Sequence, residues 1–116
     1  MANWTTLPYQ NLIAYQVARE LVIRVREARI ADAKLRDQAM RAAASACLNV
    51  AEAAGRTSAA DKARVYGIAR GEASEAAAAL DVAAAAGWCT TAAAAAGAST
   101  GTRLFALLTA LSRKAG

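Results

Sequence analysis

The chain has no histidine, one proline, two cysteines and few aromatic residues, which make up 5% of its 116 residues. Without histidine it lacks the commonest general base and a frequent metal ligand, and two cysteines alone cannot complete a zinc site. No glycine-rich phosphate-binding loop follows a strand-like segment. We therefore expect no enzyme activity, no bound metal and no cofactor.

The scarcity of proline favours long helices. Pro8 precedes the first periodic segment, and no later segment contains a proline that would interrupt a helix. Alanine, the strongest helix former, makes up roughly a third of the chain, and alternating runs of β-branched residues are absent. The predicted fold is a single all-α domain over residues 1–116. The expected helices cover residues 9–30, 34–54, 58–86 and 91–113.

Short connections between these helices favour an antiparallel, up-down-up-down four-helix bundle. Residues typical of helix ends support the boundaries. We expect Asp32 and Ser58 to cap helix N-termini, Gly55 and Gly87 to follow helix C-termini, and Thr90 or Thr91 to cap the last helix.

No segment has the composition of a targeting or membrane-spanning sequence. Residues 1–10 lack the basic and apolar regions of a signal peptide. Residues 82–102 carry no charge but consist mostly of alanine, glycine and threonine, which gain little by leaving water. We expect a cytoplasmic protein that has no contact with a membrane, in which Cys47 and Cys89 are reduced, inert thiols.

The stretch from residue 41 to 56, RAAASACLNVAEAAGR, places its polar residues along one line of a helix. The opposite side carries Ala39, Ala43, Ala46, Val50 and Ala53. The polar stripe consists of Arg41, Ser45, Asn49 and Glu52, with Arg56 at its end.

Three interpretations of this polar stripe are open. The favoured one is structural: Arg41, Ser45, Asn49 and Glu52 satisfy one another and the Glu75 carboxylate at a partly buried helix or subunit contact. The stripe would otherwise be a solvated helix face, or a surface that contacts a partner directly.

The net charge of +5 suggests an anionic partner, most often a nucleic acid. Because aromatic residues are few, contact with phosphates is a more plausible mode than stacking on bases. The alternative is that the charge only keeps the protein soluble. The candidate phosphate contacts are Arg19, Arg24, Arg26, Arg29, Lys34 and Arg36.

Two further helix faces are candidate oligomer interfaces. Leu12, Ile23 and Ile30 line up across from the apolar core face of the first helix. Gly67 and Gly71 belong to a line of small residues in the third helix, where glycine costs helix stability unless another backbone approaches closely. Low-complexity drift in an alanine-rich sequence would also explain this line of small residues.

Three sequence blocks resemble the 23S rRNA intervening-sequence protein family of bacterial four-helix-bundle proteins. The first is YQNLIAYQVARELVIRV, residues 9–25, which is similar to the family's L-x-x-W/Y-Q-x-A-x-x-L. The second is residues 41–52, similar to R-A-x-x-S-I-x-x-N-I-A-E-G. The third is YGIARGEASEAAAAL, residues 66–80, similar to F-L-x-I-A-x-G-S-x-x-E-L-x-x-x-L.

The resemblance implies a four-helix bundle that assembles as a homopentamer. Together with the basic charge and the absence of catalytic residues, this favours a non-catalytic, oligomeric accessory protein that binds RNA or DNA. The accessory variability determinant (Avd) of diversity-generating retroelements is a distant relative, which implies a reverse transcriptase as a partner. The sequence departs from the family pattern where Ala53 replaces glycine and where Ala46 and Ala76 replace larger residues, indicating a looser core. The alternative function is a structural or protein-interaction bundle without a nucleic-acid role.

Overall fold

The computed structural model describes residues 6–115 and the side chains of residues 6–114. Residues 1–5, which contribute to the expectation of no signal peptide, lie outside the described residues. The described part of the chain contains four α-helices and no strand, which confirms the predicted all-α fold. The helices are α1 (Ile13–Ala28), α2 (Ala33–Gly55), α3 (Ala59–Ala85) and α4 (Thr91–Ala115).

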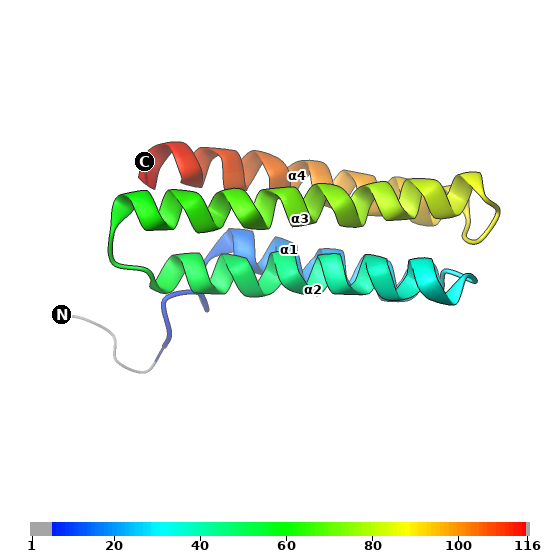
Figure 1. Cartoon of the computed structure of the whole chain (residues 1–116), viewed down its shortest axis with the longest axis horizontal. Coiled ribbons are helices and arrows are strands. Elements are labelled where there is room, and N and C mark those ends of the chain that lie inside the picture. The colour runs from blue at the N-terminus through cyan, green and yellow to red at the C-terminus, as the bar shows by residue number, and fades with distance from the viewer. Residues whose placement is uncertain (1–5, 116) are drawn as a thin grey trace.

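The helices form an elongated antiparallel bundle in which each packs beside the next, and α4 also packs against α1 (Figure 1). The most extensive contacts are those of α3 with α2 and α4. Helix α1, with 16 residues, is much shorter than the other three. At one end of the bundle, the amide of Ala31 donates a hydrogen bond to the carbonyl of Trp88 at 2.9 Å, joining two connections.

Helix α1 begins later and ends earlier than the sequence predicts. The residues around Pro8 form two successive turns, in which the amides of Gln10 and Leu12 donate to the carbonyls of Leu7 and Tyr9. Leu12, the residue before α1, has extended backbone angles (φ −82°, ψ 123°), so the helix begins only at Ile13. At the other end, Arg29 adopts a left-handed conformation with φ 50°, and this stops the helix at Ala28.

The ends of α2, α3 and α4 lie close to their expected positions. The side chains of Asp32 and Ser58 accept hydrogen bonds from the amides of Leu35 and Asp61, as expected for N-caps. Thr90 caps α4 through the amide of Ala93. Gly87 follows α3 with φ 78°. The expectation for Gly55 was wrong: it is the last residue of α2 and does not have a positive φ.

Small side chains allow the helices to approach closely. The side of α2 expected to be apolar is fully buried, and buried leucines from α1, α3 and α4 fill the remaining volume. The tightest glycine lies in α4, where a Cβ added to Gly97 would overlap the side chain of Leu80 in α3. An added Cβ on Gly101 would lie 3.1 Å from the Cβ of Ala77. The α3–α4 contact therefore depends on two glycines of α4.

Candidate functional site

The polar stripe of α2 is divided into separate contacts rather than one network. Arg41 Nη2 lies 3.2 Å from Glu75 Oε2 and joins α2 to α3. Asn49 Nδ2 donates within α2 to the carbonyl oxygen and Oγ of Ser45, at 2.9 and 3.2 Å. Glu52 pairs instead with Arg56. The expected single network is absent because three of its members bond one helical turn away along α2, and only Arg41 reaches Glu75.

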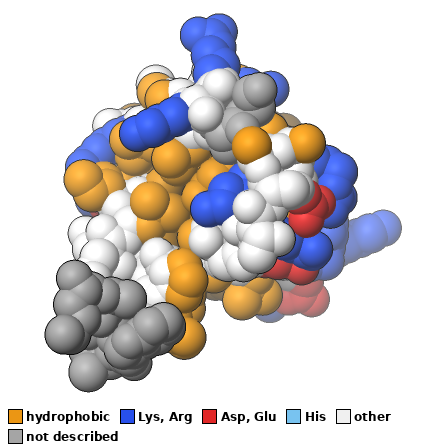
Figure 2. Space-filling model, turned by 90° about the vertical axis from the view of Figure 1, so that its left-hand side faces the viewer, with side chains coloured by type: hydrophobic (Ala, Val, Ile, Leu, Met, Phe, Trp, Pro, Cys, Tyr) orange, Lys and Arg blue, Asp and Glu red, His pale blue; other side chains and the backbone are white. Residues whose placement is uncertain are grey.

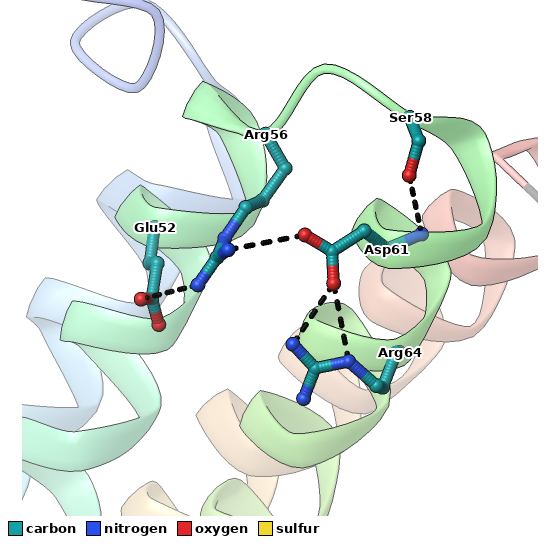
Figure 3. Close-up of polar contacts among 5 residues, drawn as sticks. All are labelled: Glu52, Arg56, Ser58, Asp61 and Arg64. Atoms are coloured by element: carbon teal, nitrogen blue, oxygen red, sulfur yellow. Dashed lines mark hydrogen bonds and ion pairs between the residues drawn. The ribbon is translucent and has the colours of Figure 1, made fainter.

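The end of the stripe continues into an ion-pair cluster that fixes the turn between α2 and α3 (Figure 3). Arg56 bridges Glu52 of α2, at 2.8 Å, and Asp61 of α3, at 3.1 Å. Asp61 also accepts two hydrogen bonds from Arg64. These guanidinium groups, that of Arg64 first, lower the pKa of the Asp61 carboxyl below its usual range. This cluster has a clear structural role.

A surface hollow lies along the polar stripe of α2. It is lined by Arg41, Ser45, Asn49 and Glu52 of the stripe, together with Ala44 and Leu48. Leu48 is 70% exposed, the largest value among the exposed large hydrophobic side chains of the described chain. A second hollow lies beside it, between α1 and α2, and shares Ala44 and Leu48 with the first. Its other lining residues are Tyr15, Arg19, Val22, Ile23, Arg26 and Cys47. We call this second hollow the α1–α2 groove.

Two of the six candidate phosphate contacts, Arg19 and Arg26, line the α1–α2 groove. Both are exposed, and neither makes an ion pair within the described residues. Arg24 differs because Glu20 and Glu27 pair with it at 3.1 and 3.7 Å, so its charge is locally neutralised.

The other three candidates lie near the turn between α1 and α2 and outside the groove lining. Arg29 and Lys34 are exposed. Arg36 donates a hydrogen bond from Nη1 to the carbonyl of Ile30 at 3.0 Å, which holds the turn but leaves its charge uncompensated. The structure therefore divides the six candidates into a groove pair, a neutralised arginine and a set at the turn.

The groove holds no activated nucleophile. Burial raises the pKa of the Cys47 thiol, and burial is also the largest cause of the raised pKa of Tyr15 beside it. Cys47 and Cys89 are both free thiols. Within the described residues, no three histidine, cysteine, aspartate or glutamate side chains are grouped so that they could hold a metal ion. In the part of the chain that the structure describes, no helix is both long and apolar enough to span a membrane.

The candidate oligomer residues have different environments. Ile30 is only 1% exposed, so its assignment to an exposed line with Leu12 and Ile23 was wrong. The left-handed Arg29 ends the helix before Ile30, and the chain then turns this side chain into the core. Leu12 packs partly against the core. Ile23 is half-buried and lines the groove.

Gly67 and Gly71 lie on the outer side of α3, and an added Cβ at either would meet nothing within 4 Å. No described residue of the same chain approaches them, so the predicted close backbone contact would have to come from another copy of the chain. They remain candidates only for contact with another molecule.

Sequence reasoning missed the contributions of Tyr15, Val22, Cys47 and Leu48 to the groove. Part of the signal was present, because Tyr15, Arg19 and Arg26 follow one another at helical spacing on one face of α1. The position of Leu48 beside that face depends on how α2 packs against α1, which helical periodicity does not specify.

A model of the 23S rRNA-intervening sequence protein family matches residues 10–110. This match covers all of α1, α2 and α3 and most of α4. No curated protein matches the chain.

Proposed function

The chain belongs to the 23S rRNA-intervening sequence protein family, and we propose that it is a non-catalytic, oligomeric accessory protein that binds RNA or DNA through phosphate contacts. The observation that carries this proposal is the pair of unneutralised arginines, Arg19 and Arg26, along an open groove. Arginine at such positions can bind phosphate oxygens in a bidentate manner.

The charge distribution supports this mode of binding. Among the described residues, five of the nine acidic side chains form ion pairs, all of them with arginine. The net charge of +5 is therefore carried largely by basic groups that remain available to a polyanion. The groove offers one partly exposed aromatic ring, Tyr15, so sequence-independent phosphate contact is favoured over base stacking.

Assembly as a homopentamer forms part of the proposal. Ile23 and the exposed Leu48 supply an apolar area along the groove, and the outer side of α3 offers small residues at Gly67 and Gly71. Repetition of the arginine pair around a five-fold ring would increase the positive electrostatic potential that attracts a nucleic acid. Light scattering coupled to size-exclusion chromatography measures the oligomeric state directly. A monomer at micromolar concentration would contradict the proposed pentamer.

A reverse transcriptase is a further proposed partner, supported only by the distant similarity to the accessory proteins of diversity-generating retroelements. A reverse-transcriptase gene adjacent to this one would support it, and co-purification of the two proteins would test it. We also propose a cytoplasmic location, a reducing compartment in which the free thiols of Cys47 and Cys89 would persist.

The alternative is a structural or protein-interaction bundle with no nucleic-acid role. One observation favours it: Leu48, 70% exposed, lies between the polar stripe and the arginines, where an apolar partner surface could cover it. In that case, Leu48→Ser would abolish assembly or partner binding and nucleic acid would not bind at low salt.

Fluorescence anisotropy with a labelled single-stranded RNA separates the two functions. The double variant Arg19→Gln/Arg26→Gln should bind about tenfold more weakly at low salt, or worse. The matched control is Arg103→Gln/Arg113→Gln, which removes two exposed charges of α4 that do not line the groove. Equal loss in both variants would show that only net charge matters, and it would contradict a site in the groove.

A further inference from the structure

A second basic hollow lies at the end of the bundle where α3 begins and α4 ends, separate from the α1–α2 groove. Four residues line it: Lys62 and Tyr66 from α3, and Leu111 and Lys114 from α4. Figure 2 views this end, where hydrophobic side chains reach the surface in the centre and lysine and arginine side chains lie above them and to either side. No acidic residue belongs to the lining.

Tyr66 supplies a polar group to this hollow. The residue is only 4% exposed, but its hydroxyl is not one of the fully buried side-chain atoms of the described chain that lack a hydrogen-bond partner, which are Arg24 Nε and Glu72 Oε2. No hydrogen bond joins the hydroxyl to another described residue, so it is accessible from the hollow that Tyr66 lines. Burial also raises the pKa of Tyr66, so the hydroxyl stays protonated and can donate a hydrogen bond at neutral pH. It can therefore serve a ligand that accepts hydrogen bonds.

The two lysines are not neutralised by the chain itself. All ion pairs among the described residues use arginine, and neither Lys62 nor Lys114 takes part in one. The nearest carboxylate in sequence, Asp61, is already held by Arg56 and Arg64. The first turn of α3, which contains Lys62, adds the positive end of a helix dipole.

We propose that this hollow binds a phosphate group, with the ammonium groups of Lys62 and Lys114 supplying charge and the hydroxyl of Tyr66 donating a hydrogen bond. Three residues with donor groups line one hollow, and no carboxylate belongs to the lining, which suits a compact oxyanion. Leu111 supplies an apolar wall. The phosphate could be inorganic phosphate or the terminal phosphate of a nucleic acid. This site does not depend on phosphate contacts in the α1–α2 groove.

Isothermal titration calorimetry with inorganic phosphate tests the site in the intact protein. The wild type should bind, and Tyr66→Phe should weaken binding by about tenfold, the usual effect of losing one hydrogen bond to a charged group. This variant removes a single oxygen that has no partner within the described chain, so the fold should be retained. Lys62→Gln and Lys114→Gln should each weaken binding as well, whereas Arg103→Gln should leave it unchanged.

The source of the phosphate is distinguished by oligonucleotides of identical sequence with a 5′-phosphate or a 5′-hydroxyl. Tighter binding of the phosphorylated strand, lost in Tyr66→Phe, would assign the site to a nucleic-acid end. Equal binding of both strands, with inorganic phosphate still bound, would assign it to free phosphate. The proposal is overturned if inorganic phosphate does not bind, or if Tyr66→Phe binds as tightly as the wild type. Loss of groove binding in Arg19→Gln/Arg26→Gln would leave phosphate titration unaffected, so the two proposals fail separately.

Discussion

Leu80 of α3 occupies the space that Gly97 of α4 leaves free, and a methyl group at Gly97 would overlap its Cδ1 atom. Leu80 is fully buried, so it cannot turn away into solvent. We predict that Gly97→Ala lowers the free energy of unfolding by about 1 kcal/mol, because overpacking outweighs the gain in helix propensity. Urea denaturation measures the change.

The matched control is Gly67→Ala in α3, where an added Cβ meets nothing within 4 Å. It should stabilise the chain by about 0.5–1 kcal/mol, because alanine is the better helix former. Equal stabilisation by both substitutions would contradict the close α3–α4 packing. If Gly67→Ala reduces the oligomer size instead, a second copy packs closely against α3.

Removal of the Arg41–Glu75 ion pair should lower the free energy of unfolding only slightly. Their side chains are 66% and 38% exposed, and exposed pairs contribute at most about 1 kcal/mol. A double-mutant cycle of Arg41→Ala and Glu75→Ala should give a coupling energy of about 0.5 kcal/mol, measured by chemical denaturation. A coupling energy above about 2 kcal/mol would be inconsistent with an exposed pair and would show that assembly buries it.

Ionisation of Asp61 should make the free energy of unfolding depend on pH in the acidic range. Arg64 and Arg56 lower its pKa in the folded state, so its contribution is fully present above the unfolded pKa of about 3.9. The contribution is lost as pH falls through the lower, folded-state pKa. The stability difference between wild type and Asp61→Asn should therefore shrink from neutral pH towards about pH 2.

Asp81→Asn is the control for Asp61→Asn, because Asp81 is exposed and forms no ion pair within the described residues. Its effect on stability should stay small at every pH. A constant difference for Asp61→Asn across the pH series would mean that the guanidinium contacts do not favour the ionised carboxyl.

The two cysteines should differ in their rates of alkylation. Burial raises the pKa of both thiols, but Cys47 is buried in α2 and Cys89 is partly exposed in a turn. Iodoacetamide at neutral pH should therefore label Cys89 first in the folded protein, as followed by mass spectrometry. In urea, the two rates should become similar. Rapid labelling of Cys47 without denaturant would indicate that the groove opens.

Helical periodicity and capping residues were sufficient to predict four helices and their order, because alanine-rich segments with caps such as Asp32 and Ser58 have few alternative structures. They failed at the end of α1, where the backbone conformation of one residue decides which side chain is buried. The left-handed Arg29 sends Ile30 into the core, and no local feature of the sequence specifies that conformation. The role of Gly97 depends on Leu80, seventeen positions earlier, and so on tertiary packing.

The candidate site was only partly predictable for the same reason. The spacing of Glu20, Arg24 and Glu27 indicates that Arg24 is neutralised, since residues three and four apart are neighbours on a helix. Lys62 and Tyr66 likewise share a face of α3, but Lys114 joins them only through the packing of α4. Local spacing therefore identifies neighbours within a helix, whereas tertiary packing determines which helices together form a site.

The most direct test of phosphate contact in the groove is the dissociation constant for single-stranded RNA as a function of salt concentration. Contact with phosphates predicts that log Kd rises linearly with log salt concentration. The slope should decrease by about two in Arg19→Gln/Arg26→Gln, one for each lost contact. An unchanged slope in this variant, binding that salt does not weaken, or no binding at low salt would contradict the proposed function.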